Sequence, residues 1–90
     1  MFEWDDANTE HIGWHEVTPA EVEEAFTYPE RVPAIAYRGR TGERRRAWIG
    51  ATLEGRVLVV VYTVRDNRNR ILMARDATER EYQRYVRGTR

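Results

Sequence analysis

The hydrophobic pattern of the chain is dominated by one unbroken run, VLVVVYTVR at 57–65. Successive side chains of a strand point to opposite faces, so a run that is apolar at every position predicts a strand buried on both faces. The run is too short to cross a bilayer. A polar segment at 66–69 separates it from a second apolar run at 71–75, and this arrangement predicts a hairpin.

Two further segments alternate with a period of two, VPAIAYR at 32–38 and RRRAWIGATL at 44–53. Each predicts a strand, and Pro33 favours an edge position for the first because proline has no N–H for the ladder. Alternation in the second segment places Arg46 and Trp48 on the same face.

Helix-start signals occur at three places. TPAE at 18–21 combines a hydroxyl cap, proline at the first helical position and glutamate three residues after the cap, which predicts a helix that ends before Pro29. TERE at 78–81 repeats the capping box and predicts a C-terminal helix. Two aspartates at 5–6 are caps for a first helix expected over residues 7–15.

The pattern as a whole predicts an α+β fold. We expect two N-terminal helices, a small antiparallel four-stranded meander and a C-terminal helix, with the helices on one side of the sheet and 57–65 in its interior. FEW at 2–4 fits either a short leading strand or a hydrophobic anchor. Ninety residues suit a single domain over 1–90 with one modest core.

Charge is divided unevenly along a chain whose formal net charge is zero. Residues 1–30 contain nine acids and no lysine or arginine, whereas residues 31–90 contain all fifteen arginines and six acids, a net of +9. A guanidinium is always charged and grips phosphate bidentately. The second part of the chain is therefore expected to attract phosphate, which a non-catalytic nucleic-acid-binding domain would also do.

The absence of cysteine excludes disulfides and thiolate metal sites. The two histidines, His11 and His15, lie four residues apart and are expected to share a helix face. Two nitrogen ligands alone make a weak metal motif, so we expect no metal and no other cofactor. The histidines are expected to be helix-packing residues, or His15 is expected to act in catalysis or substrate contact. No secretory signal is recognisable, which predicts a cytoplasmic location without a membrane segment.

Three segments, HIGWHEVTPAEVEEAF, IGATLEGRVLVVVYTVR and RILMARDATEREYQRY, resemble the BrnT family of toxins from type II toxin-antitoxin systems. The resemblance covers nearly the whole chain, and its last segment is the most specific. It implies a RelE-like fold, endoribonuclease activity on RNA, and neutralisation by a cognate ribbon-helix-helix antitoxin of the BrnA type.

The chain departs from the family pattern before its second helix. The family usually has a basic residue, histidine and glycine there, and this chain has Trp14, His15 and Glu16. The departures favour an alternative function, a catalytically degenerate toxin that acts as a protein-binding module.

RNA cleavage without a metal needs a base for the 2′-hydroxyl, positive charge at the pentavalent phosphate and an acid for the leaving 5′-oxygen. The catalytic candidates are Arg75, at the end of the last strand, His15, on which the family motif falls, and Arg65. Arg75 has a competing structural role, pairing with an acid at 76, 79 or 81. The candidates for RNA contact are Arg45, Arg46, Trp48, Tyr62, Arg70 and Tyr85, of which the tyrosines also suit a core position.

Overall fold

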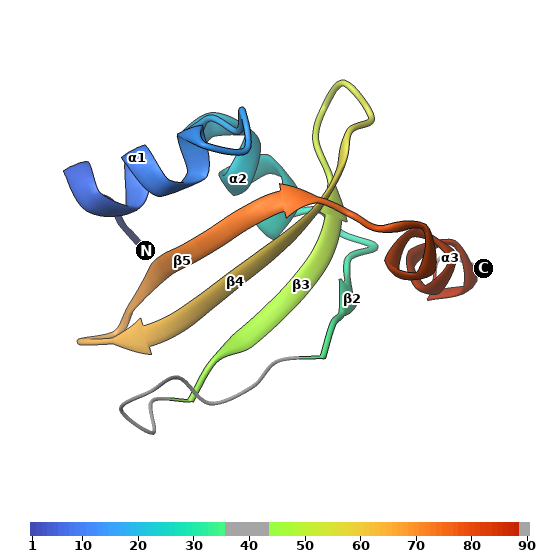
Figure 1. Ribbon diagram of the computed structural model, residues 1–90. Helices are drawn as coiled ribbons and strands as arrows, with labels where there is room; N and C mark the ends of the chain where they lie inside the picture. Colours follow the sequence, from blue (N-terminus) through green and yellow to red (C-terminus); the bar gives the residue numbers. More distant parts are fainter. Residues whose placement is uncertain (36–43, 89–90) are drawn as a thin grey trace.

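The computed structural model describes residues 1–35 and 44–88, which form a mixed sheet with flanking helices (Figure 1). Within these residues, five strands lie in the spatial order β1-β5-β4-β3-β2. The elements in chain order are β1 (Phe2–Glu3), α1 (Asp6–Gly13), α2 (Pro19–Phe26), β2 (Val32–Pro33), β3 (Arg46–Ala51), β4 (Val57–Arg65), β5 (Arg68–Asp76) and α3 (Glu79–Gly88). The predicted α+β class is confirmed.

Strand β4 is the interior strand that its apolar run predicts, because it pairs antiparallel with β3 on one side and β5 on the other. Its buried side chains divide between the two faces, with Leu58, Val60 and Tyr62 on one and Val59 and Val61 on the other. Asp66 and Asn67 join β4 to β5 with φ angles of 52° and 62°. Two successive left-handed residues are typical of the tight type I′ hairpin turn.

The expectation of a purely antiparallel four-stranded meander is wrong. Residues Phe2 and Glu3 form β1, which pairs parallel with β5 opposite Asn69 and Arg70. The leading-strand interpretation of residues 2–4 is thus the correct one. Two residues are too few to show the periodicity that predicts a strand. Tertiary contacts position β1, since the Phe2 ring packs edge-on against the Phe26 ring at a centroid distance of 5.1 Å.

Of the strand predicted over 32–38, only residues 32–35 lie in the described part of the chain. Only Val32 and Pro33 form β2, and residues 36–43 lie outside the described part of the chain. The Ala34 N–H still donates to the Ala47 carbonyl at 3.0 Å. The segment expected at 44–53 narrows to β3, because the chain turns at Thr52, whose N–H bonds to the Arg56 carbonyl at 2.8 Å.

The predicted helix caps are confirmed. Asp5 caps α1, and Thr18 forms the capping box of α2 with Glu21. Thr78 and Glu81 exchange the same pair of hydrogen bonds at the start of α3, at 2.8 and 3.2 Å. Helix α1 ends at Gly13, two residues before the expected end.

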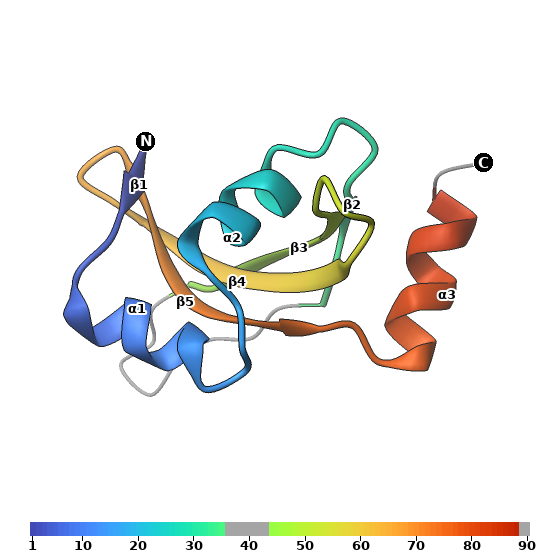
Figure 2. The same cartoon turned by 90° about the horizontal axis from the view of Figure 1, so that it is seen from above.

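Helices α1 and α2 cover one face of the sheet, where Ile12, Val22 and Phe26 join the first core cluster. Helix α2 approaches β3 so closely that a Cβ at Gly50 would collide with the carbonyl of Ala25. Helix α3 contradicts the expectation that all helices share this side, because its Tyr85 packs against the second core cluster, on the opposite face. Figure 2 shows α3 apart from α1 and α2, at the end of the sheet. Its stripe is weakly buried, and Tyr82 is 42% exposed.

Candidate functional site

The sheet face opposite α1 and α2 has an apolar floor. Its second core cluster contains Val32, Ala47, Ile49, Val59 and Val61, with Leu72 and Met73 partly buried beside them. Among the described helices, only α3 packs against this cluster, at one end of the sheet (Figures 1 and 2). We call this surface the open face. Its centre is therefore not covered by a described helix.

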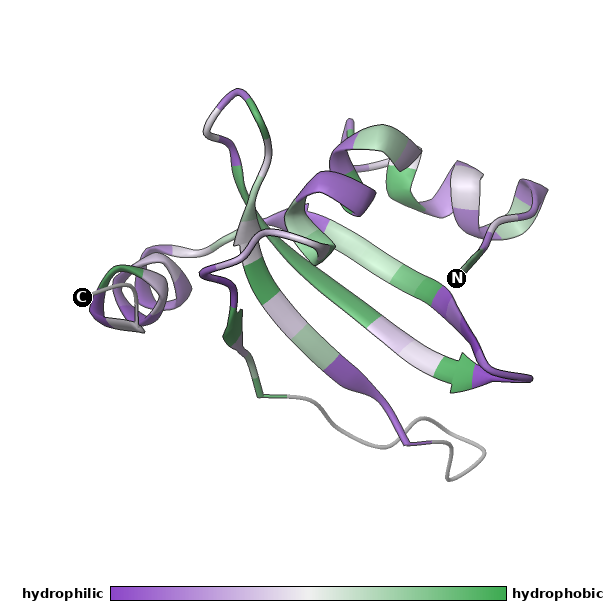
Figure 3. Ribbon diagram, turned by 180° about the vertical axis from the view of Figure 1, so that it is seen from behind, coloured by the Kyte–Doolittle hydropathy of each residue, from purple (hydrophilic) through white to green (hydrophobic). Residues whose placement is uncertain are grey.

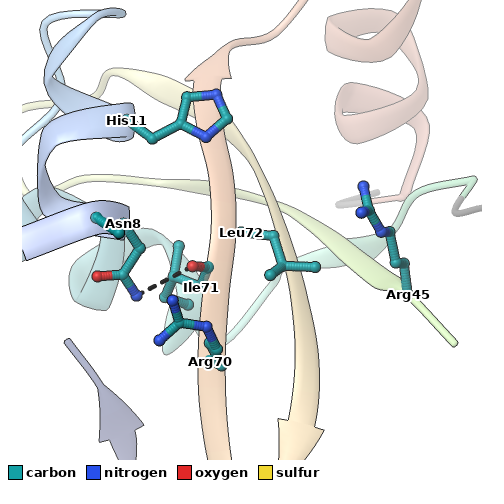
Figure 4. A pocket seen from close by; sticks show the side chains of 7 residues that line it. Asn8, His11, Arg45, Arg70, Ile71 and Leu72 are labelled. Atoms are coloured by element: carbon teal, nitrogen blue, oxygen red, sulfur yellow. Dashed lines mark hydrogen bonds between the residues drawn. The ribbon is translucent and has the colours of Figure 1, made fainter. Parts of the chain in front are cut away.

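A hollow lies at the margin of the open face, between α1 and the beginning of β3. It is lined by Ala7, Asn8, His11, Arg45, Arg70, Ile71 and Leu72. Figure 4 shows His11 reaching from α1 over β5, Arg70 below it on the same strand, and Arg45 across the hollow beyond Leu72. One imidazole and two guanidinium groups thus line one cavity.

Asn8 fixes the position of this helix over the strand. Its buried side-chain amide donates to the carbonyls of Glu3 at 2.8 Å and Ile71 at 3.1 Å. Its Oδ1 accepts from the Asp5 N–H at 2.8 Å, which completes the cap of α1. His11 follows three residues later, so the same contacts hold its backbone beside β5.

Arg70 is neutralised by two carboxylates. Its Nη1 lies 2.9 Å from Glu3 Oε1 and 2.7 Å from Asp5 Oδ2. The hydrogen bond with Arg70 lowers the pKa of Asp5, and the bonds from Asp5 and Glu3 raise the pKa of Arg70. Arg70 is a predicted RNA contact that also joins β5 to β1 and to the start of α1.

Arg75 lies on the open face at the other end of β5 and pairs with α3. Its Nη1 and Nη2 reach the two carboxylate oxygens of Glu81 at 2.7 and 3.0 Å, and Nη1 also donates to the Asp76 carbonyl. The bond from Arg75 lowers the pKa of Glu81 to about 2. Glu81 is one of the three acids expected to compete for Arg75, and the catalytic role of Arg75 stays a prediction.

Arg56 organises the turn that bears His15. Its guanidinium donates to the carbonyls of Glu16 at 2.8 Å and His15 at 3.1 Å, and it pairs with Asp76 at 2.7 Å and Glu21 at 3.2 Å. Asp76, foremost, and Glu21 raise the pKa of Arg56. Glu16 adopts a left-handed φ of 57°, which the anchored turn holds in place.

His15 itself lies on this exposed turn and does not line the hollow. Its ring centroid is 6.4 Å from that of His11, and the Trp14 ring, tilted by 56° to the His11 ring, lies 5.0 Å from it. His15, the histidine that matches the family motif, thus lies in the turn that follows α1, close to His11 of the hollow.

The remaining predicted arginines occupy a different place. Arg46 and Arg65 line a second hollow, at the end of the sheet where β3 begins and β4 ends. Trp48 lies under Arg31, whose Cζ is 4.5 Å from the ring centroid. The structure therefore separates Arg45 from Arg46 and Arg65, which line different hollows.

The two tyrosines of the predicted contact set are largely enclosed. Tyr62 is 6% exposed and meets Phe26 edge-on at 4.8 Å. Tyr85 lies between Tyr28 and Tyr82, each 6.1 Å away, and burial, together with a hydrogen bond with Tyr28, raises its pKa to about 12. Both side chains contribute to packing in this structure.

Sequence reasoning missed three residues of this region. The spacing Asp5-x-x-Asn8 was a usable capping signal, but nothing local marks Asn8 as a bridge to β5. Arg56 stands alone before an apolar run, and its partners are 20 to 41 residues away in sequence. His11 was expected as a packing or weak metal-binding residue. In the described part of the chain, no group of three potential metal ligands occurs.

Fold and site together define a small α+β protein with an apolar open sheet face, arginines at the margins of that face and a histidine-bearing helix beside it. Residues 4–81 match the family model of the ribonuclease toxin BrnT of type II toxin-antitoxin systems, and the chain belongs to this family. Among curated proteins, none matches the chain significantly. Across the described residues, no helix is long and apolar enough to cross a membrane.

Proposed function

We propose that the chain is a metal-independent endoribonuclease toxin that cleaves RNA at the hollow between α1 and β3. The observation that carries the proposal is the convergence of His11, Arg45 and Arg70 on one cavity of the open face. Family membership supplies the reaction class, a ribonuclease toxin. The hollow supplies the imidazole of His11 and the positive charge of Arg45, and side-chain groups of these kinds are what a reaction without a metal requires.

In the proposed reaction, the 2′-oxygen of one ribose attacks the adjacent phosphorus. The new bond from 2′-oxygen to phosphorus forms as the bond from phosphorus to the 5′-oxygen breaks, leaving a 2′,3′-cyclic phosphate and a 5′-hydroxyl. The imidazole of His11 accepts the proton of the 2′-hydroxyl, the departing 5′-oxygen takes a proton from solvent water, and Arg45 stabilises the pentavalent phosphate. Arg70, held by Glu3 and Asp5, forms the wall beneath His11.

The sequence-based catalytic residues remain part of the proposal. His15 is the alternative imidazole, one turn away from His11. Arg75 and Arg65 are alternative phosphate ligands, and the pair between Arg75 and Glu81 supports a structural role for Arg75 instead. We also propose a RelE-like fold, which rests on the family resemblance. The proposals of a single domain and of a cytoplasmic location rest on the sequence.

The proposed partner is a cognate ribbon-helix-helix antitoxin. A type II system pairs each toxin with a protein antitoxin, and covering the open face would shield the hollow from RNA. A second candidate function is a catalytically inactive toxin that only binds this partner. The exposure of Trp14, 71%, favours it, because an exposed tryptophan suits a protein interface.

The test is incubation of the purified protein with end-labelled RNA in EDTA, and then with added zinc. Cleavage in EDTA that yields a cyclic phosphate, and that stops when co-purified antitoxin is added, is the expected result. No cleavage under either condition, with retained antitoxin binding, would establish the inactive alternative. Activity only with zinc would contradict metal independence.

A further inference from the structure

In the second hollow, at the polar end of the sheet, every charged side chain among the described lining residues is cationic. Its walls are Arg44, Arg46, Thr63, Val64 and Arg65. Figure 3 shows this end of β3, together with the nearby β4–β5 turn, as the hydrophilic end of a sheet whose middle is apolar. No carboxylate belongs to the described lining.

Backbone contacts with β4 position two arginines of this hollow, Arg44 and Arg46. The buried Thr63 hydroxyl donates to the Arg44 carbonyl at 2.9 Å, and Arg46 pairs with Tyr62 in the ladder between β3 and β4. Arg44 precedes β3 by two residues, and both Arg44 and Arg46 line the hollow. The backbone that presents them is therefore ordered before any ligand arrives.

The arginines of the protein differ in how their charge is balanced. Arg56, Arg70 and Arg75 each pair with at least one carboxylate. Among the residues that the structure describes, Arg44 and Arg46 form no ion pair with a carboxylate. Neighbouring guanidinium groups repel one another, and an anion that enters the hollow relieves this repulsion.

We propose that Arg44, Arg46 and Arg65 bind a backbone phosphate of single-stranded RNA, at a nucleotide outside the cleaved linkage. This inference rests on the proposed function, since it assigns a second contact for the same substrate. Arg45, between Arg44 and Arg46, lines the His11 hollow, so three consecutive arginines at the start of β3 and just before it supply guanidinium groups to both hollows. Regularly spaced phosphates of one strand match such a series. A protein segment would require more apolar lining than Val64 provides.

The binding test uses a fluorescein-labelled single-stranded RNA with 2′-O-methyl groups, which blocks the attacking oxygen and separates binding from cleavage. Fluorescence anisotropy over a range of salt compares wild type with the double variant Arg44→Ala/Arg46→Ala. We expect an affinity loss of about tenfold or more. The slope of log K against log salt should become less steep by about 0.7 for each phosphate that the variant no longer neutralises.

Two control variants isolate the hollow. Arg80→Ala/Arg87→Ala removes the same charge from the exposed face of α3 and should leave affinity and slope near wild type. Arg44→Lys/Arg46→Lys keeps the charge and should retain most of the slope, although an ammonium cannot form the bidentate hydrogen bonds of a guanidinium. A loss of affinity in the α3 variant equal to that in the hollow variant would overturn the proposal, because net charge alone would then explain binding.

The remaining outcomes separate this inference from the proposed function. Hollow variants that bind RNA like wild type, in a protein that cleaves RNA, overturn the phosphate site and leave the function intact. If the wild-type protein does not cleave RNA, but the hollow variants bind RNA more weakly than wild type, the phosphate site is supported and the proposed function is overturned. Unchanged RNA affinity together with failure to capture the co-expressed antitoxin would assign the hollow to the protein partner and also overturn the proposal.

Discussion

The side-chain amide of Asn8 donates to the carbonyl oxygen of Ile71 at 3.1 Å, across 63 residues of sequence. This hydrogen bond fastens α1 to β5 directly beside the hollow that contains His11. The same amide binds the Glu3 carbonyl, so one buried side chain joins α1, β1 and β5. The position of the candidate catalytic imidazole therefore depends on a residue that has no chemical role of its own.

Replacing Asn8 by aspartate tests this dependence. The substitution keeps an oxygen for the Asp5 N–H but places a carboxylate against the carbonyls of Glu3 and Ile71. We expect stability to fall by about 2–3 kcal/mol in urea unfolding, since buried acceptors lose their donor. Cleavage per folded molecule should fall as well. Thr9→Ala, at an exposed neighbouring position, should change neither, and an Asn8→Asp protein with wild-type stability would contradict this role.

Arg56→Ala should loosen the turn that carries His15. The guanidinium has four partner residues, and its loss should lower the free energy of unfolding by about 2–3 kcal/mol at neutral pH. The pKa of Asp76 is lowered chiefly by Arg56, and that of Glu21 by the Thr18 N–H and then Arg56. Lowered carboxyl pKa values stabilise the fold above about pH 4 and lose this effect as pH falls. The free energies of unfolding of the variant and of wild type should therefore approach each other as the pH falls. A difference in unfolding free energy that stays constant down to pH 2 would refute the ion-pair account.

Glu81→Gln should remove a distinct part of the acid dependence of folding. The carboxyl pKa is about 2 in the folded protein and 4.5 ordinarily, so its stabilising effect is complete above pH 4.5 and disappears between pH 4.5 and 2. The contribution at pH 7 is up to about 3 kcal/mol. Chemical unfolding at several pH values measures it. Glu79→Gln, on the exposed side of the same turn, serves as the control and should leave the pH profile unchanged.

Arg75→Ala distinguishes the two roles considered for Arg75. Because Arg75 binds both carboxylate oxygens of Glu81, we expect weaker folding with cleavage per folded molecule largely preserved. Melting temperature and single-turnover cleavage should be measured on the same preparation. A roughly hundredfold loss in rate with unchanged melting would restore Arg75 to the catalytic site.

The sequence was sufficient where structure depends on local chemistry or on long periodic runs. Strand β4, the capping boxes at Thr18 and Thr78, and the buried stripe of α2 all follow from neighbouring residues. Strand β1 does not, because two residues show no periodicity and their place depends on β5. The sequence also could not predict which face of the sheet α3 covers, because the amphipathic stripe of α3 fits either face.

The candidate site was harder to predict than the fold. Arginines dominate the second part of the chain, and sequence alone does not show which of them acquire carboxylate partners. Those partners come from the acidic first part, as Glu3 and Asp5 do for Arg70. Arg45 and Arg46 were both predicted as RNA contacts, but the structure places them in different hollows, and the presence of His11 opposite Arg45 depends on how Asn8 docks α1.

The most direct measurement of the central claim is single-turnover cleavage of labelled RNA in EDTA by wild type, His11→Ala and His15→Ala. Removing a general acid or base costs about a hundredfold or more, so we predict this loss for His11→Ala at unchanged melting temperature. His15→Ala should retain most of the wild-type rate. Full activity in His11→Ala, or the reverse order of the two variants, would contradict a catalytic site in the hollow between α1 and β3.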